Sequence, residues 1–181
     1  MIKSMLLIMF VCALSACTPE KPAEPPQKMS SFMLSQADKD GLLVFQKNLL
    51  NTENLADKAV KVAVDEIKKV ITGGEMAGSL PAIIDVTKAE CFKAGEELAK
   101  STISNKLPPE LQVLLNDGKN GLIASYKAYG ESFEIIKRFL ADKNPMVLLE
   151  YRKKFSQAQD LYRIATDKIK QGMNAAGVPA S

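Results

Sequence analysis

Hydrophobic residues after position 35 recur at the three- and four-residue spacing of amphipathic helices, and β-rich runs between turn signals are absent. This pattern predicts an all-α fold. It is clearest in a helix beginning after Asn144-Pro145, where apolar residues alternate steps of three and four. That stripe consists of Leu148, Tyr151, Phe155, Ala158, Tyr162, Ala165 and Ile169.

Capping and turn residues divide the rest of the pattern into further segments. Ser35 followed by Asp38 resembles a capping box and predicts a helix start. The first predicted helix covers about 36–50, the second starts after Asn51 or Thr52 and runs to 72, and the third covers about 81–105. A fourth begins after the prolines at 108–109. The stretch NDGKNG at 116–121 is a strong turn signal, so we expect a kink or a true break in that fourth helix.

Charged residues repeat the helical spacing, because several acids precede a base by four residues, the favourable orientation on a helix. These pairs are Asp57–Lys61, Asp65–Lys69, Glu96–Lys100, Glu134–Arg138 and Glu150–Lys154. Short connections between long amphipathic helices favour a compact antiparallel bundle of four to five helices. An array of helical hairpins has the same periodicity and stays open as an alternative.

The N-terminus has the composition of a signal peptide. Lys3 supplies positive charge, and residues 5–13 form an apolar run too short to span a bilayer as a mature helix. The run ends in Leu14-Ser15-Ala16-Cys17, which resembles the lipobox of bacterial lipoprotein precursors. The resemblance implies that residues 1–16 are removed and that Cys17 carries a diacylglyceryl group and an amide-linked fatty acid such as palmitate. Two or three acyl chains anchor a protein stably without a transmembrane helix.

The resemblance also implies a location. Thr18, rather than Asp, follows the anchor, which favours the outer membrane with the domain facing the periplasm. The inner membrane and the cell surface stay open as alternatives. Residues 17–29 form a lipidated, proline-rich tether, because TPEKPAEPPQK at 18–28 favours extended polyproline II and cannot pack a core. Residues 30–181 then form one helical domain.

Composition narrows the chemistry of that domain. There is no histidine, which removes the Ser-His-Asp and Cys-His arrangements and the commonest zinc ligand. Without Lys3, 23 basic residues face 21 acidic ones, so the weak net charge gives no reason to expect nucleic-acid binding. Cys91 falls on an apolar helical face and is expected to be buried. We therefore predict no enzyme activity, catalytic residue, metal or cofactor; a hydrolase using Glu131 or Glu134 is a remote alternative.

The last predicted helix carries the candidate binding face, which could contact anionic lipid head groups or an acidic partner. Its members are Arg152, Lys153, Lys154, Arg163, Lys168 and Lys170. The leading hypothesis is a non-enzymatic module that binds another envelope protein in an accessory, assembly, exclusion or immunity role. The alternative is a carrier that holds an apolar small molecule or lipid between helices, suggested by Ala94, Gly95 and Ala158 on otherwise apolar faces.

Overall fold

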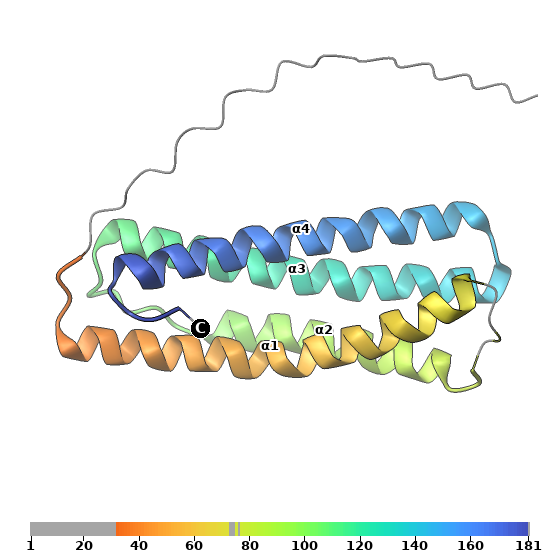
Figure 1. Ribbon diagram of the computed structural model, residues 1–181, viewed down its shortest axis with the longest axis horizontal. Coiled ribbons are helices and arrows are strands. Elements are labelled where there is room, and N and C mark those ends of the chain that lie inside the picture. Colours follow the sequence, from red (N-terminus) through yellow and green to blue (C-terminus); the bar gives the residue numbers. More distant parts are fainter. Residues whose placement is uncertain (1–31, 73–74, 76, 181) are drawn as a thin grey trace, which may run out of the picture.

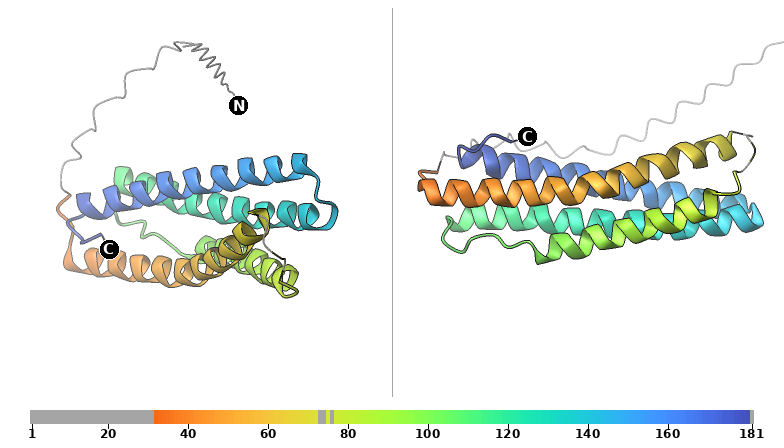
Figure 2. Two further views of the ribbon diagram at one scale, coloured as in Figure 1. Left: turned by 45° about the vertical axis from the view of Figure 1, so that its right-hand side comes forward. Right: turned by 90° about the horizontal axis from the view of Figure 1, so that it is seen from below.

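A computed structural model of the protein describes residues 32–72, 75 and 77–180. Within them the chain forms four helices and no strand, which confirms the predicted all-α fold. The helices are α1 (Gln36–Ile71), α2 (Leu80–Lys100), α3 (Pro109–Asp142) and α4 (Pro145–Ala175). The helices lie side by side along the long direction of the molecule, and each runs antiparallel to the next (Figures 1 and 2). The predicted signal peptide and tether lie outside the described residues.

Two helix starts follow the predicted capping chemistry. The Ser35 hydroxyl accepts a hydrogen bond from the Asp38 backbone N–H at 3.2 Å and donates to the Asp38 carboxylate at 2.6 Å. At the start of α4, the Asn144 side chain accepts from the Met146 N–H at 2.9 Å, and Pro145 occupies the first turn. These bonds satisfy N–H groups that have no partner within a helix.

The predicted boundary at 51–52 is wrong, because α1 continues without interruption from Gln36 to Ile71. The Thr52 hydroxyl donates to the Asn48 carbonyl at 3.0 Å within the helix instead of capping a new one. The third predicted helix is shorter than expected and ends at Lys100.

A true break at 116–121 is also wrong, because α3 runs through this stretch. Both glycines there face α4. A Cβ on Gly118 would lie 2.6 Å from Ile169 Cγ1, and one on Gly121 would lie 2.8 Å from Ala165 Cβ. The glycines therefore let two helix backbones approach closely, which is a packing role rather than a turn.

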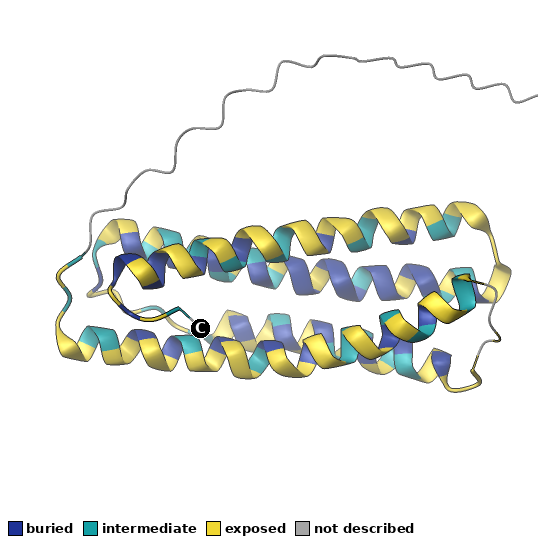
Figure 3. Cartoon of the chain, in the orientation of Figure 1, coloured by how far each residue is buried: buried dark blue, intermediate teal, exposed yellow. Residues whose placement is uncertain are grey.

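α3 is the central element of the core, and it is buried on more of its circumference than α1 or α4 (Figure 3). It packs most extensively on α4, then on α2, and α1 packs mainly on α2. The largest wholly buried side chains of α3 are Leu111, Leu115, Leu122, Tyr126, Phe133 and Ile136. None of the described helices is both long enough and apolar enough to cross a membrane.

The chain after α4 turns back toward α1. Gly177 adopts a left-handed conformation (φ 66°), Val178 N–H donates to Met173 O, and Gly177 N–H donates to Asn174 O, both at 3.0 Å. This is a Schellman motif. The following segment reaches α1, where the Gln46 amide donates to the Pro179 carbonyl at 3.2 Å. Residues 176–180 thus lie along the α1–α4 seam at one end of the bundle (Figure 1).

None of the five predicted ion pairs at four-residue spacing forms among the described residues. Arg138 pairs instead with Glu150 across the α3–α4 interface, and its predicted partner Glu134 pairs with Lys88 of α2 at 2.6 Å. Lys69 pairs with Glu66, three residues away. A charged residue on a neighbouring helix competes with the intrahelical one for the same ion-pair partner. The spacing of charges along the sequence does not reveal such contacts between helices.

Candidate functional site

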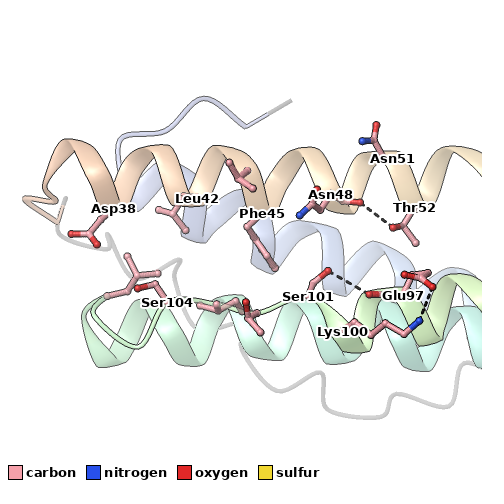
Figure 4. A pocket seen from close by; sticks show the side chains of 15 residues that line it. Asp38, Leu42, Phe45, Asn48, Asn51, Thr52, Glu97, Lys100, Ser101 and Ser104 are labelled. Carbon is pink, nitrogen blue, oxygen red and sulfur yellow. Dashed lines mark hydrogen bonds and ion pairs between the residues drawn. The ribbon is translucent and has the colours of Figure 1, made fainter.

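A groove of about 670 Å³ lies between the first half of α1 and the end of α2 with its connection to α3 (Figure 4). We call this the α1–α2 groove. Residues 38–52 of α1 form one wall, and residues 97–107 form the other. Its volume lies within the range of ligand sites in proteins.

The walls of the groove combine apolar and polar groups. Leu42, Phe45 and Leu107 are buried and line the inner part. Figure 4 shows Leu42 and Phe45 pointing from α1 toward the opposite wall. The polar lining includes amide, hydroxyl and charged side chains: Asp38, Asn48, Asn51, Thr52, Glu97, Lys100, Ser101, Thr102 and Ser104. This surface can satisfy both the side chains and the peptide groups of a bound polypeptide.

Hydrogen bonds hold the second wall in place. Lys119 of α3 donates to the Ser101 carbonyl at 2.9 Å, and the Gln112 amide donates to the carbonyls of Leu107 at 2.6 Å and Asn105 at 3.1 Å. The connection between α2 and α3 is therefore fixed onto α3, so the groove is built into the fold.

A second hollow of about 230 Å³ continues the groove along α1 and α2. The two share Asn51, Thr52 and Glu97. Val44 lines the first hollow and Leu55 the second, and they are 59% and 60% exposed. Exposed apolar side chains beside polar ones are common at protein-interaction sites.

A separate polar group lies where α1, α3 and α4 meet and reaches from the core to the surface, because two of its members are buried, one is half-buried and one, Asp57, is exposed. It consists of Glu53, Asp57, Tyr126 and Tyr162, which we call the carboxylate–tyrosine cluster. Asp57 accepts hydrogen bonds from the Tyr126 hydroxyl at 2.9 Å and the Tyr162 hydroxyl at 3.4 Å. Glu53 is only 9% exposed, and its Oε1 atom has no hydrogen-bond partner among the described residues.

Burial sets the protonation of this cluster. Desolvation and, to a smaller extent, repulsion from Asp57 raise the pKa of Glu53 to about 7, although the Tyr162 hydroxyl acts in the opposite direction. Burial also raises the pKa of Asp57, although its two tyrosine hydrogen bonds lower it. Burial beside these acids raises the pKa of the Tyr126 hydroxyl, which stays protonated and able to donate.

The sequence does indicate that Glu53 is buried, but this is visible only when residues 36–71 are treated as one helix without the predicted break at 51–52. In the continuous α1, the buried positions are three, four or seven residues apart, as in a core stripe: Leu42, Phe45, Leu49, Glu53, Ala56, Ala63 and Ile67. Glu53 occupies a core position in this stripe. A carboxylate at such a position is the signal that identifies the cluster.

The six predicted binding residues of α4 do not share one face. Arg152, Arg163 and Lys170 are exposed and lie on the same side, because they are separated by eleven and seven residues, close to whole helical turns. Lys154 and Lys168 turn toward α3 and pair with Glu131 and Asp117. Lys153 is exposed, and Arg163 lies 3.9 Å from Asp160. The structure therefore brings half of the predicted residues together.

Glu131 and Glu134 point to different helices: Glu131 pairs with Lys154 of α4, and Glu134 pairs with Lys88 of α2. The Lys88 hydrogen bond lowers the pKa of Glu134. General acid catalysis at neutral pH needs a carboxyl whose pKa is raised, so this arrangement does not suit Glu134 to that role.

Cys91 is wholly buried, as expected, and burial raises the pKa of its thiol to about 12. Of the three small residues that suggested a carrier, Ala94 lines the second hollow, whereas Gly95 and Ala158 lie at helix contacts. The Ser125 hydroxyl of α3 donates to the Ala158 carbonyl of α4 at 2.9 Å, and a Cβ on Gly95 would lie 3.8 Å from the Ile123 carbonyl of α3. These positions permit close approach of neighbouring helices.

Comparison with known proteins adds no relative. The chain matches no family model, no curated protein and no solved structure.

Proposed function

We propose that this protein is a lipid-anchored, periplasm-facing helical lipoprotein and acts as a non-enzymatic protein-interaction module. In this proposal the α1–α2 groove binds a segment of another envelope protein, in an accessory, assembly, exclusion or immunity role. Acyl chains on Cys17 hold the protein to the outer membrane, and residues 17–29 space the bundle from the lipid.

The observation that carries the proposal is the groove itself. It is preformed, its walls belong to different elements, and its lining mixes buried apolar side chains with amide and hydroxyl groups. A polypeptide segment presents the same mixture of apolar side chains and hydrogen-bonding backbone groups. A purely apolar ligand would leave many of these polar groups without partners, which is unfavourable.

The location of the groove agrees with this role. Asp38, in the first turn of α1, belongs to its lining, so the groove opens near the end of the bundle that joins the predicted tether. A partner embedded in the same membrane would meet this end first.

Site-specific photo-crosslinking in cells tests the proposal. A photoreactive amino acid replaces Val44, and the full-length protein is expressed in its own host. A second substitution, Thr52→Arg, fills the groove, whereas Ser156→Arg places the same side chain on the exposed surface of α4. We expect one discrete protein adduct from position 44 that decreases at least about tenfold with Thr52→Arg and persists with Ser156→Arg, since a tenfold loss corresponds to about 1.4 kcal/mol.

An adduct that is insensitive to Thr52→Arg would contradict binding in the groove. So would the absence of an adduct under conditions that capture the known partner of a control lipoprotein. A native mass spectrum of the same preparation addresses the carrier alternative, since a discrete small-molecule mass bound to the protein would favour it.

A further inference from the structure

Glu53 faces a small cavity between α1 and α4. The cavity has a volume of about 50 Å³, enough for water and too small for an organic ligand of drug size. Its lining combines apolar side chains with a few polar ones: Gln46, Leu49, Leu50, Glu53, Thr166, Ile169, Lys170, Met173 and Ala180. The Glu53 Oε1 atom is buried and has no hydrogen-bond partner among the described residues.

Ionisable groups from all four helices face the two carboxylates. Asp57 lies one turn further along α1, Cys91 faces it from α2, and Tyr126 and Tyr129 face it from α3. From α4 come Tyr162, beside both carboxylates, and Lys170, at the cavity. The described part of the C-terminal segment contributes the apolar Ala180.

The tyrosine hydroxyls favour Asp57 as the charged member of the pair. Tyr126 and Tyr162 both donate to Asp57; the Tyr162 hydroxyl also lowers the pKa of Glu53, but no described residue donates to Glu53 Oε1. Lys170 lines the cavity, but neither carboxylate forms an ion pair within 4 Å among the described residues. A buried negative charge on Glu53, next to the charge of the more exposed Asp57, would lack compensation.

We propose that Glu53 is a proton-binding site that determines how firmly α1 is held against α4. A proton from solvent binds the Glu53 carboxylate, removes its charge and ends its repulsion of Asp57, so the seam closes. When the proton leaves, the carboxylate draws water or the Lys170 ammonium into the cavity, and the seam loosens.

Two carboxylates from one turn of α1 suit a proton better than a metal ion. Calcium takes six to eight oxygen ligands, and magnesium requires nearly ideal octahedral geometry. Among the described residues there is no group of three or more His, Cys, Asp or Glu side chains that could hold a metal.

The sign of the pH effect follows from proton linkage. Glu53 has a pKa of about 7 in the fold and 4.5 as an unperturbed group, so the folded protein binds the proton more tightly. The stabilisation is fully present below pH 4.5 and is lost as the pH rises toward 7 and above. This group alone raises the unfolding equilibrium constant on the order of a hundredfold between pH 4.5 and 7.5, so the native state is less stable at the higher pH.

Carboxyl ¹³C NMR on the full-length protein, assigned by comparison with Glu53→Gln, gives the direct test. We expect Glu53 to titrate near pH 7. Equilibrium unfolding at pH 5 and 7.5 should show a large pH dependence in the wild type that Glu53→Gln largely removes. Glu66→Gln is the matched control on α1, because Glu66 pairs with Lys69 at the surface, and it should retain the wild-type dependence.

Hydrogen exchange, corrected for intrinsic rates, tests the seam itself. Amides of α1 near Glu53 should exchange faster at pH 7.5 than at pH 5.5 in the wild type, and this difference should be absent in Glu53→Gln. Titration of Glu53 near 4.5, or an undiminished pH dependence in Glu53→Gln, would overturn the proposal. So would a shift of the Glu53 resonance by calcium, magnesium or sodium ions at pH 7.5, since that would identify a cation site. If Glu53→Gln does not fold, the Glu53 carboxyl resonance is assigned in the wild type through its own backbone and side-chain connectivities, and its titration decides the matter.

Discussion

At the scale of single residues, identical side chains have different roles according to what lies opposite them. Gly41 of α1 has open space where a Cβ would project, whereas Gly118 of α3 lies against α4. A Cβ on Gly118 would be 2.6 Å from Ile169 Cγ1 and 3.0 Å from the Ala165 carbonyl oxygen. One glycine therefore only weakens its helix, and the other makes a helix contact possible.

These glycines give a pair of opposite predictions. Gly118→Ala should lower the free energy of unfolding by about 1–3 kcal/mol, because forced separation of α3 and α4 outweighs the gain in helix propensity. Gly41→Ala should raise it by about 0.5–1 kcal/mol, because only the propensity gain applies. Urea unfolding of both variants measures these changes. A neutral or stabilising Gly118→Ala would show that the α3–α4 interface is looser than described.

At the scale of elements, the ends of the helices decide where the chain goes next. The C-terminal Schellman motif sends residues 178–180 across to α1, where Val178 is buried and Pro179 accepts from Gln46. This segment extends the contact between α1 and α4 beyond their own side chains.

Gly177→Ala should therefore affect more than α4. A left-handed conformation costs an alanine about 1 kcal/mol, so we expect a loss of stability of that size. We also expect weaker protection of α1 amides near Gln46, because the segment then leaves the seam more easily. Calorimetry and amide exchange measure the two effects. Gly177→Asn is the control, since asparagine tolerates this conformation better and should lose less.

At the scale of the whole molecule, the four helices differ in how extensively they pack on one another. α3 packs closely on α4 and α2, whereas α1 packs mainly on α2 and faces α4 across the cavity and the C-terminal segment. The element that forms one wall of the α1–α2 groove is thus the one with the least extensive packing. Regions with few buried contacts open at lower free energy.

This asymmetry predicts an order of opening. Native-state hydrogen exchange should show the slowest amides in the middle of α3, around Leu122 and Tyr126, and faster exchange throughout α1. Uniform protection across the helices, or a more protected α1, would contradict this description. Thermal unfolding alone would not reveal the difference, because a small bundle unfolds as a unit near its transition.

The sequence by itself determined the helical class, the antiparallel bundle, two helix starts and the burial of Cys91. These follow from local rules: apolar periodicity, capping side chains and the position of a small apolar residue on a helical face. It also provides the lipobox-like segment and the proline-rich stretch, which lie outside the described residues and still support only a prediction. These signals are read from neighbouring residues in the chain.

Only the tertiary structure decided the features that depend on residues far apart in sequence. The stretch 116–121 stays helical because Gly118 and Gly121 pack against α4. Arg138 and Lys154 form ion pairs with residues of other helices. The α1–α2 groove arises from how a connecting segment packs on α3, and the cluster around Glu53 forms where three helices meet. Local propensity is weak compared with these packing and desolvation energies, which exist only once the helices come together.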